Sequence, residues 1–577
     1  MPAEWGSDVI VDMMKAYGIK YAPLNLGGTY RGLLDSMLNY GGNETPVAIE
    51  CLHEEIAVGV AHGYSKASGE PSVALVHNVV GTLHASMAIY ETFVSKTPVI
   101  VMSGTGPMSI PERRPWIDWV HTALVQGNLV RDYVKWDDQP HDPASFPESF
   151  MRAYRVAMTE PRGPVYIALD AGWQEAQLQQ PIPIPDVSKF AAPAPVQGDP
   201  GALRRAARLL AEAEFPIILA DRVGRNPGAV ASLIELAEAA TIPVVDVGGA
   251  FNFPNTHPLD ATGTDLIGLA DVVLLLDVEQ PEVVLVSRDR YPRGPSPSRL
   301  KAGATVVSIG LSDLAIRSTM TDYGRLYPVS LSIAADTSLA IPQLTEELRS
   351  LGATKPSAGA DKRRATIGER KTSAQRRWAD EADREAGHRP ISHARLAQET
   401  WSHLKGDPWV LQGSPEGWAR RLWEIDRPGS VISAGGAAGL GTGLSRAIGV
   451  GLAARDRGGY CVAFNGDGDF FYDPSCLWTA VHHHIPVLAF VLDNGGYIGE
   501  GGHVTYINQQ RERSTANKHI AVEIREPRID IAGYARAQGA YAEGPIEDPS
   551  ELGPAIARAL KVVKEESTLA LLAVRVP

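Results

Sequence analysis

Short apolar runs that alternate with amphipathic segments are the feature that most constrains the fold of this chain. Apolar runs without polar alternation are typical of strands buried on both faces, and helices between them cover parallel sheets. The pattern therefore predicts an α/β fold of three consecutive domains, each with a parallel sheet flanked by helices. The runs form three groups, at residues 73–80, 98–104 and 164–170, then 216–221, 242–249, 271–277 and 305–310, then 430–436, 460–469, 486–494 and 569–576.

Two segments without this pattern divide the chain. Residues 181–200 are rich in proline, and residues 352–373 are polar, basic and rich in glycine and alanine. Both compositions are typical of connections between domains. A chain of 577 residues is also too long for one core. We expect a first domain over 1–182, a middle domain over 198–350, a linker over 351–375 and a third domain over 376–577.

Composition excludes several classes of protein. The chain has 54 Lys and Arg against 67 Asp and Glu, a net charge of −13, which argues against a nucleic-acid partner. No apolar run of about 18 residues is free of charge, so we expect no membrane span. Cys51, Cys461 and Cys476 stand singly, which argues against a zinc site or a disulfide framework. A cytoplasmic protein is the expectation.

Polar residues follow two neighbouring apolar runs of the third group. Asp467 comes after one run, and Asn494 comes after the next. In a parallel sheet both emerge at the carboxyl edge, where open α/β sheets bind ligands. A carboxylate, an amide oxygen and the backbone carbonyl of Gly496 are hard ligands that suit Mg²⁺ shared with a diphosphate. Glycines at 466 and 468 let the backbone approach that diphosphate. Two ordinary turns remain the alternative for this motif alone.

The spacing of this motif, with Gly466, Asp467 and Gly468 followed after 25 residues by Asn494, resembles the thiamine diphosphate motif of one superfamily. That superfamily comprises acetolactate synthase and pyruvate decarboxylase, with 2-hydroxyacyl-CoA lyase and oxalyl-CoA decarboxylase among its members. The resemblance implies that Asp467, Asn494 and the Gly496 carbonyl hold Mg²⁺. In residues 439–444, Leu440 matches the bulky residue that props the bent cofactor. The cofactor-binding residues implied are Leu440, Gly441, Gly466, Gly468, Asp469, Gly496 and Tyr497.

A second stretch, residues 52–69, resembles the part of the same family that carries the activating glutamate. Glu54 matches the glutamate that hydrogen-bonds N1′ of the aminopyrimidine, and this proton exchange allows the cofactor to lose its C2 proton. The alternative is an exposed carboxylate at a helix start. The resemblance also implies that Glu54 of one subunit meets the diphosphate domain of another. We therefore expect a homodimer or homotetramer with active sites between subunits.

The substrate side of the site is less well defined by the sequence. His77 matches a histidine of benzoylformate decarboxylase, and His121 lies in a segment that resembles one of pyruvate decarboxylase, with Val120 replacing its first histidine. Glu500 matches a glutamate near the reacting centre of that enzyme. We expect catalytic roles for His77, His121 and Glu500 alongside Glu54, since histidine and glutamate relay protons. Ordinary hydrogen-bonded or surface residues are the alternative for each.

Departures from the family decide the favoured reaction. The loop at 27–30 lacks the aspartate of pyruvate decarboxylase, and His121 replaces the glutamine of acetolactate synthases. Residues 287–301 carry a cluster of basic side chains that suit phosphates. In this family the middle domain of some members binds FAD, ADP or CoA. We favour a 2-hydroxyacyl-CoA lyase that gives a carbonyl compound and formyl-CoA. The alternative is an acetolactate synthase-like carboligase or a decarboxylase acting on a 2-oxo acid.

Overall fold

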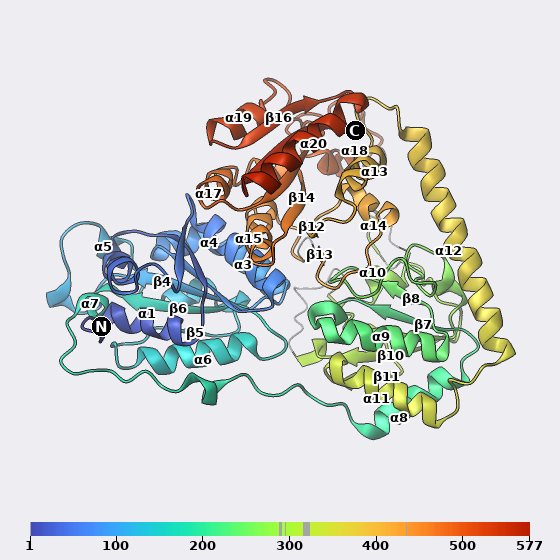
Figure 1. Ribbon diagram of the computed structural model, residues 1–577, viewed down its shortest axis with the longest axis horizontal. Helices are drawn as coiled ribbons and strands as arrows, with labels where there is room; N and C mark the ends of the chain where they lie inside the picture. Colours follow the sequence, from blue (N-terminus) through green and yellow to red (C-terminus); the bar gives the residue numbers. More distant parts are fainter. Residues whose placement is uncertain (1, 288–290, 295, 315–323, 434–435) are drawn as a thin grey trace.

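A computed structural model describes residues 2–287, 291–294, 296–314, 324–433 and 436–577 and shows three domains in chain order (Figure 1). Each domain holds one sheet, and every strand pair within these sheets is parallel. The predicted fold class is confirmed.

The first sheet has the strand order β2-β1-β3-β4-β6-β5. Helices lie on both of its faces, and β3 and β4 are buried along their whole length. Its strands are β1 (Tyr21–Asn25), β2 (Val47–Glu50), β3 (Ser72–Val76), β4 (Val99–Thr105), β5 (Asp137–Asp138) and β6 (Val165–Asp170). Its helices are α1 (Gly6–Ala16), α2 (Arg31–Asp35), α3 (Glu54–Ser68), α4 (Val79–Val94), α5 (Ile117–Val120), α6 (Phe146–Met158) and α7 (Ala171–Glu175).

The apolar run at 73–80 is not one strand. The strand ends at Val76 and α4 begins at Val79, because Asn78 caps the helix. Its Oδ1 accepts a hydrogen bond from the N–H of Val80 at 3.2 Å, and asparagine is a preferred N-cap residue. The last two valines of the run therefore belong to a helix, and His77 lies in the turn before it.

The middle sheet has the order β11-β10-β9-β7-β8. All five residues of β7 and of β9 are buried, as a two-faced core requires. The strands are β7 (Pro216–Ala220), β8 (Val244–Asp246), β9 (Val272–Leu276), β10 (Thr305–Gly310) and β11 (Leu331–Ala334). The helices are α8 (Pro200–Glu212), α9 (Pro227–Ala240), α10 (Glu282–Leu285) and α11 (Thr337–Ser350).

The third sheet has the order β13-β12-β14-β15-β17-β16, with β14 and β15 at its centre. The strands are β12 (Trp409–Gln412), β13 (Val431–Ile432), β14 (Tyr460–Gly466), β15 (Val487–Asp493), β16 (Tyr541–Ile546) and β17 (Leu569–Arg575). The helices are α13 (His393–Leu404), α14 (Trp418–Leu422), α15 (Gly443–Arg455), α16 (Asp467–Phe470), α17 (Cys476–His482), α18 (Ile498–Gln510), α19 (Ile531–Ala537) and α20 (Pro549–Glu565). Part of the expected run 430–436 lies outside the described residues.

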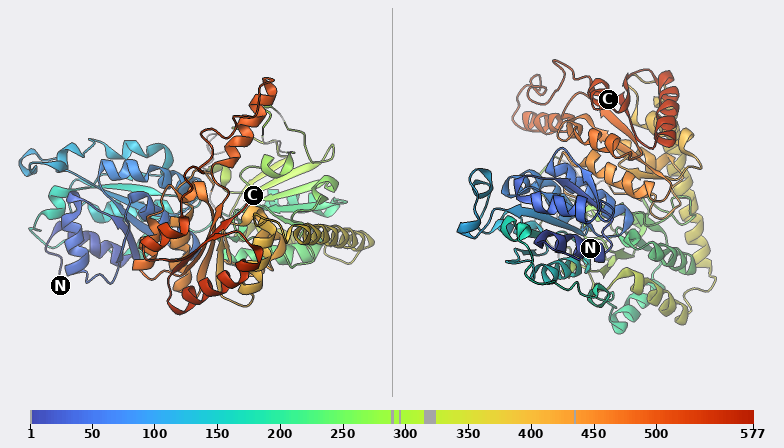
Figure 2. Two further views of the ribbon diagram at one scale, coloured as in Figure 1. Left: turned by 90° about the horizontal axis from the view of Figure 1, so that it is seen from above. Right: turned by 60° about the vertical axis from the view of Figure 1, so that its left-hand side comes forward.

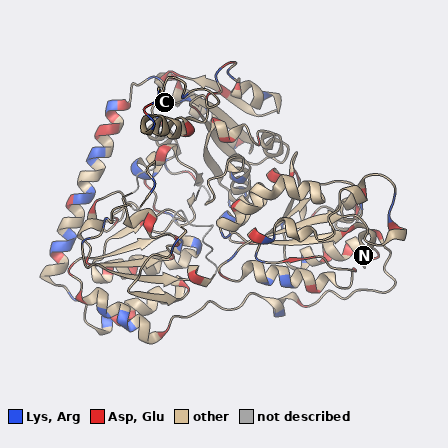
Figure 3. Cartoon of the chain, turned by 180° about the vertical axis from the view of Figure 1, so that it is seen from behind, with Lys and Arg blue, Asp and Glu red and all other residues tan. Residues whose placement is uncertain are grey.

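The connection between the middle and third domains contains a long helix. α12 (Ala358–Glu385) has 28 residues and runs along the outer side of both domains (Figures 1 and 2). Figure 3 shows charges of both signs along it, which explains the polar composition of this segment. The amine of Lys371 donates to the carbonyl oxygens of Asn255 and His257, at 2.6 Å each. The expected boundary at 375 therefore falls inside a helix that packs on the middle domain.

Among the described helices, none combines the length and the apolar character needed to cross a membrane. The three cysteines are buried and unpaired.

Candidate active site

Asp467 and Asn494 lie at one edge of the third sheet. The strands that precede them, β14 and β15, are adjacent and parallel, so the residues that follow emerge side by side. The Asp467 carboxylate is buried, and it joins the start of α16 to the turn after β15. It accepts backbone hydrogen bonds from Gly468 (2.9 Å), Gly495 (2.8 Å) and Gly496 (3.0 Å).

The oxygen atoms around this edge suit a hard cation. Burial, with a smaller contribution from the carboxylate of Asp493, raises the pKa of Asp467 to about 6. A bound cation opposes such a shift, because it favours the ionised carboxylate. Gly496 has φ 145°, and a Cβ there would stand 2.3 Å from the Val522 carbonyl oxygen. A carboxylate, the amide oxygen of Asn494 and a backbone carbonyl are ligands that fit Mg²⁺.

A cavity of about 770 Å³ opens beside this loop. Gly466 lines it, and apart from its two chain neighbours no atom of the described residues lies within 4 Å of the position that a Cβ would take. The backbone there is therefore open to a ligand. Gly468 is packed under the ring of Tyr497, which a Cβ would approach to 2.7 Å. Leu440 and Glu500 also line the cavity.

The loop before α15 forms the opposite wall. Gly441 has φ 102°, and its N–H donates to Asp469 Oδ1 at 2.5 Å. A Cβ on Gly441 would come within 2.9 Å of the Tyr472 side chain. The structure thus places the cofactor-binding residues predicted from the sequence around one cavity, except Gly441, which lies in the loop of the wall without lining it, and the three predicted metal ligands also line the cavity. The cavity fits a diphosphate-bearing group.

Glu54 begins α3 in the first domain and is only 5% exposed. His53 caps the helix, since its ring accepts a hydrogen bond from the N–H of Glu55 at 3.2 Å. The Glu54 carboxylate contacts His84 of α4, with 3.0 Å between Oε2 and Nδ1. A Cβ on Gly81 would lie 2.7 Å from Oε1 of Glu54. Glu54 is therefore a buried carboxylate, not an exposed residue at a helix start.

His77 and His121 converge near Glu54. Their ring centroids are 5.8 Å apart and the rings are nearly perpendicular. His77 Nε2 and His121 Nδ1 are buried and have no hydrogen-bond partner among the described residues. Burial lowers the pKa of His77, against the raising effect of Glu54. Two buried imidazole nitrogens without partners fit a ligand that carries polar atoms.

The two halves of the site adjoin within one chain. α3 and α15 cross so closely that a Cβ on Gly63 would lie 1.9 Å from the Arg446 carbonyl oxygen. Near the start of both helices, the Glu55 carboxylate lies 3.3 Å from the Cβ position of Gly441. Burial and the charge of Asp469 raise the pKa of Glu55 to about 7.

The cavity beside the metal loop is lined by only one of the four catalytic residues predicted from the sequence. The described residues that line it include Glu500, but not Glu54, His77 or His121. Within one chain the histidine side and the metal side are therefore neighbours that do not share one cavity.

Sequence reasoning missed His84, Glu55 and Glu91. Glu91 is buried on α4, and its carboxylate accepts the N–H groups of Gly436 (2.8 Å) and Ala437 (3.0 Å) in the loop leading to the cavity. These partners lie more than 340 residues away along the chain. No local pattern signals such a contact, because it exists only after the domains pack.

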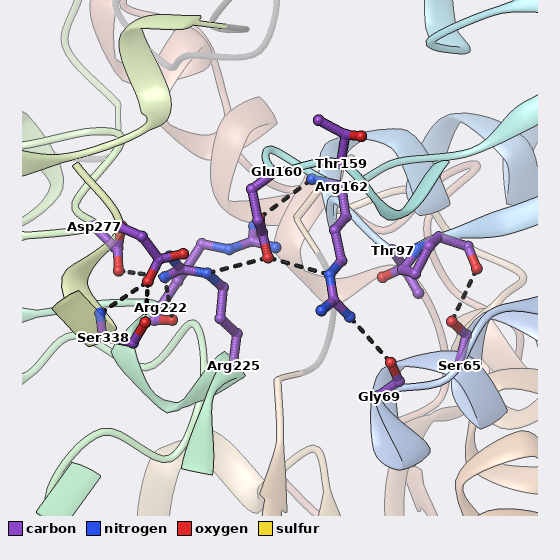
Figure 4. A network of polar contacts seen from close by, with 12 residues as sticks. Ser65, Gly69, Thr97, Thr159, Glu160, Arg162, Arg222, Arg225, Asp277 and Ser338 are labelled. Carbon is purple, nitrogen blue, oxygen red and sulfur yellow. Dashed lines mark hydrogen bonds and ion pairs between the residues drawn. The ribbon is translucent and has the colours of Figure 1, made fainter. Parts of the chain in front are cut away.

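A second cavity, of about 230 Å³, lies where the three domains meet. Figure 4 shows Glu160 between two guanidinium groups, 3.2 Å from Arg162 and 3.5 Å from Arg225. Burial and the charges of Arg446 and Arg222 lower the pKa of Lys66 to about 7. The basic side chains that line this cavity come from all three domains and are Lys66, Lys96, Arg162, Arg222, Arg225 and Arg457.

The predicted basic loop 287–301 does not line this cavity in its described part. Residues 288–290 and 295 of that loop lie outside the described residues. Arg299 donates to the Val284 carbonyl oxygen at 2.9 Å within its own domain.

Family models match most of the chain in the expected order. The N-terminal TPP binding domain of thiamine pyrophosphate enzymes matches residues 4–121. The central domain of these enzymes matches residues 203–344. Their C-terminal TPP binding domain matches residues 412–574.

Individual relatives agree with these matches. Over 568 residues the chain is 23% identical to the acetolactate synthase isozyme 3 large subunit of Escherichia coli, covering 97% of this chain and 92% of that protein. It is 25% identical to benzoylformate decarboxylase of Pseudomonas aeruginosa over 81% of this chain and 84% of that one. The crystal structure of benzoylformate decarboxylase from Polynucleobacter necessarius superposes with a TM-score of 0.76 at 18% identity, covering 100% of this chain and 99% of that one.

Proposed function

The chain belongs to the thiamine diphosphate-dependent superfamily of acetolactate synthases and decarboxylases, and we propose that it decarboxylates a 2-oxo acid or joins the acyl unit to a second carbonyl compound. The observation that carries this proposal is the convergence of His77 and His121 near Glu54. Protons must be supplied and removed next to the substrate carbonyl in such reactions, and neutral imidazoles are suited to both.

The third domain supplies the anchor for the cofactor. Asp467, Asn494 and the carbonyl of Gly496 would hold Mg²⁺, and the open backbone at Gly466 would lie against the diphosphate. Leu440 would support the cofactor from the opposite wall. Bound thiamine diphosphate supplies a carbon nucleophile that attacks a carbonyl group and takes up the electrons of the broken bond.

The first domain supplies the proton chemistry. Glu54 would exchange a proton with the pyrimidine nitrogen N1′, and its burial keeps that proton from water. His77 Nε2 and His121 Nδ1 would hold or donate a proton at the substrate. Glu500 would face the same substrate from the cavity wall of the third domain.

A 2-hydroxyacyl-CoA lyase is the second candidate. The junction cavity favours it, because Lys66 lines that cavity and has no hydrogen-bond or ion-pair partner among the described residues. A phosphate group of CoA, ADP or FAD would supply Lys66 with such a partner. Arg225, in contrast, is already paired with Asp277 and Asp336. A nucleotide would therefore depend on Lys66 more than on Arg225.

Product analysis tests this choice. The enzyme with thiamine diphosphate and Mg²⁺ is offered pyruvate, benzoylformate or a short 2-hydroxyacyl-CoA, and products are identified by mass spectrometry. The proposal expects CO₂ with an aldehyde or a carboligation product from an oxo acid, while the CoA ester stays intact. Formyl-CoA from the third reaction, with both oxo acids unchanged, would transfer the assignment to the lyase.

We also propose that the active protein is a homo-oligomer with a site built from two chains. Support comes from uncovered apolar residues around His121: Trp116 is 89% exposed, and Val120 and Leu124 are exposed as well. Glu54 also lies outside the cavity that Asp467 lines.

Complementation tests the oligomer. Equal amounts of Glu54→Gln and Asp467→Asn chains are refolded together and assayed. Shared sites in a dimer restore about a quarter of wild-type activity, since half of the dimers are mixed and each holds one intact site. No recovery would contradict sites shared between chains.

A further inference from the structure

His84 is the single hydrogen-bond partner that the described residues give to the Glu54 carboxylate. The contact joins His84 Nδ1 to Glu54 Oε2 at 3.0 Å. The side chain of Glu54 is 7% exposed, whereas that of His84 is 49% exposed. The buried carboxylate and solvent are therefore linked by one imidazole ring.

The orientation of His84 is fixed by its surroundings. Its ring stacks on His53, with 4.9 Å between centroids and 25° between planes. His53 is itself held, because it caps α3 through the N–H of Glu55. When Glu54 is ionised, its carboxylate can accept a hydrogen bond but cannot donate one, so Nδ1 of His84 is then the donor. Nε2 of the exposed ring is then the atom that exchanges protons with water.

The two oxygens of Glu54 have different environments. Oε2 faces His84, and Oε1 lies on the side of Gly81 and His77. One oxygen is thus engaged by a titratable group while the other remains for a ligand. A glutamate that passes a proton to N1′ needs a source from which to regain it.

We propose that His84 is a positioning residue that holds a proton for Glu54 and returns protons to it from solvent. The inference rests on the proposed function. As Glu54 shares a proton with N1′, the Nδ1 proton of protonated His84 moves to Oε2, and His84 becomes neutral. The ring keeps its proton on Nε2, so the Glu54–N1′ pair holds the proton that His84 has lost and none is drawn from water. Where His84 starts neutral with its proton on Nδ1, Nε2 takes one proton from water as the Nδ1 proton leaves.

Other titratable groups surround this pair. They are His53 and His77, whose pKa values burial lowers, and Glu55, whose pKa is raised to about 7. Asp469 of the third domain faces Glu55. Because Glu55 titrates in the same range as a histidine, it must be removed in a control.

Proton counting on the cofactor-free full-length protein separates these contributions. Thiamine diphosphate with Mg²⁺ is titrated calorimetrically in buffers of different ionisation enthalpy, which gives the number of protons taken up on binding. The proteins are wild type, His84→Asn and His84→Gln, each also with Glu55→Gln. Asparagine and glutamine can still donate an N–H hydrogen bond to Oε2, but they have no proton that can be transferred to it.

The proposal expects wild-type uptake to rise from near zero at pH 5.5 to about one proton at pH 8, as histidines lose their charge. The His84 variants take up about one proton at both pH values, because Glu54 must then draw on water. The Glu55→Gln change preserves this difference.

The failure of the inference and that of the proposed function are distinct. If wild type and a folded His84 variant both bind thiamine diphosphate and take up the same number of protons at each pH, the role of His84 alone is overturned. Proton uptake by wild type that does not vary with pH would overturn it as well. If wild type binds no thiamine diphosphate, the proposed function itself is contradicted.

Discussion

Gly27 is required by the side chain that packs on it rather than by its own backbone angle. Its φ of −136° is open to any residue, but a Cβ would stand 2.2 Å from Nε2 of His77. A Cβ on Gly28, next to it, would meet the end of the Arg114 side chain at 3.0 Å and the Asp118 carboxylate at 3.3 Å, both side-chain approaches that a small shift relieves. The two glycines therefore make a matched pair for testing His77.

Gly27→Ala should displace the His77 ring and lower turnover of the 2-oxo acid by about 10²-fold, the usual cost of misplacing a catalytic group by 1 Å. Thiamine diphosphate affinity should persist, since the metal loop is in another domain. Steady-state kinetics and a binding titration measure both. Gly28→Ala should stay near wild type because a flexible arginine can move. Equal losses in the two variants would contradict a role for His77.

At the scale of elements, the crossing of α3 and α15 sets the geometry of the site. Gly63 allows the helices to approach until a Cβ would overlap the backbone of Arg446. Both helices begin beside the candidate cofactor region, α3 with Glu54 and α15 just after Gly441. The crossing thus fixes how the first and third domains present their functional residues.

Gly63→Ala should lower the free energy of unfolding by about 1–3 kcal/mol, the range found for overpacked contacts. Gly368→Ala is the control. Gly368 lies inside α12, and outside the helix's own backbone no atom of the described chain comes within 4 Å of a Cβ there, so alanine should stabilise the helix by about 0.5–1 kcal/mol. Urea unfolding of the three proteins measures both changes. A destabilisation of similar size at 368 would refute the packing explanation.

His483 connects two elements of different domains. Glu50 lies at the end of β2, and His483 comes directly after α17. The N–H of Glu50 donates a hydrogen bond to Nε2 of His483 at 2.7 Å. Burial, assisted by the charges of His482 and Arg455, lowers the pKa of His483 to about 4. The unfolded chain therefore binds a proton first as the pH falls, and stability decreases from about pH 6.5 to pH 4.

His483→Gln should reduce this dependence, because glutamine accepts the same hydrogen bond without titrating. The free energy of unfolding is measured at pH 7, 5.5 and 4.5. Exposed His484→Gln serves as the control and should follow the wild-type curve. A variant whose acid dependence equals that of wild type would show that His483 is not responsible.

The sequence predicted the strands whose own residues are continuously apolar. β9, β14 and β15 lie inside apolar runs, and the meeting of Asp467 with Asn494 follows from parallel strands. β1 contains a proline and β2 has four residues, so each becomes a strand through pairing with its neighbours. Contacts such as Glu54 with His84 or Glu91 with Gly436 arise only from domain packing, which periodicity does not encode.

At the scale of the whole molecule, the junction of the three domains depends on buried ion pairs. Arg225 pairs with Asp277 and Asp336 of the middle domain and reaches Glu160 of the first at 3.5 Å. Burial raises the pKa of Asp277 even with the arginine present. Loss of the arginine would leave these carboxylates without their main counter-charge.

Arg225→Met should destabilise the protein by about 3–5 kcal/mol, as expected when one partner of a buried pair is removed. Arg349→Met removes an exposed arginine that pairs with Glu235, and it should leave stability unchanged within error. Thermal and urea unfolding of both variants give the comparison. If the two variants are equally stable, the junction does not depend on Arg225.

The most direct test of the account concerns Glu54 and the bound cofactor. Deuterium exchange at C2 of thiamine diphosphate, measured by quenched-flow NMR with Mg²⁺, reports cofactor activation independently of substrate. Wild type should accelerate exchange over free cofactor, and Glu54→Gln should lose at least about 10²-fold of that rate while retaining fold and oligomeric state. An unchanged exchange rate in the folded variant would contradict the assignment of Glu54 and, with it, the central claim.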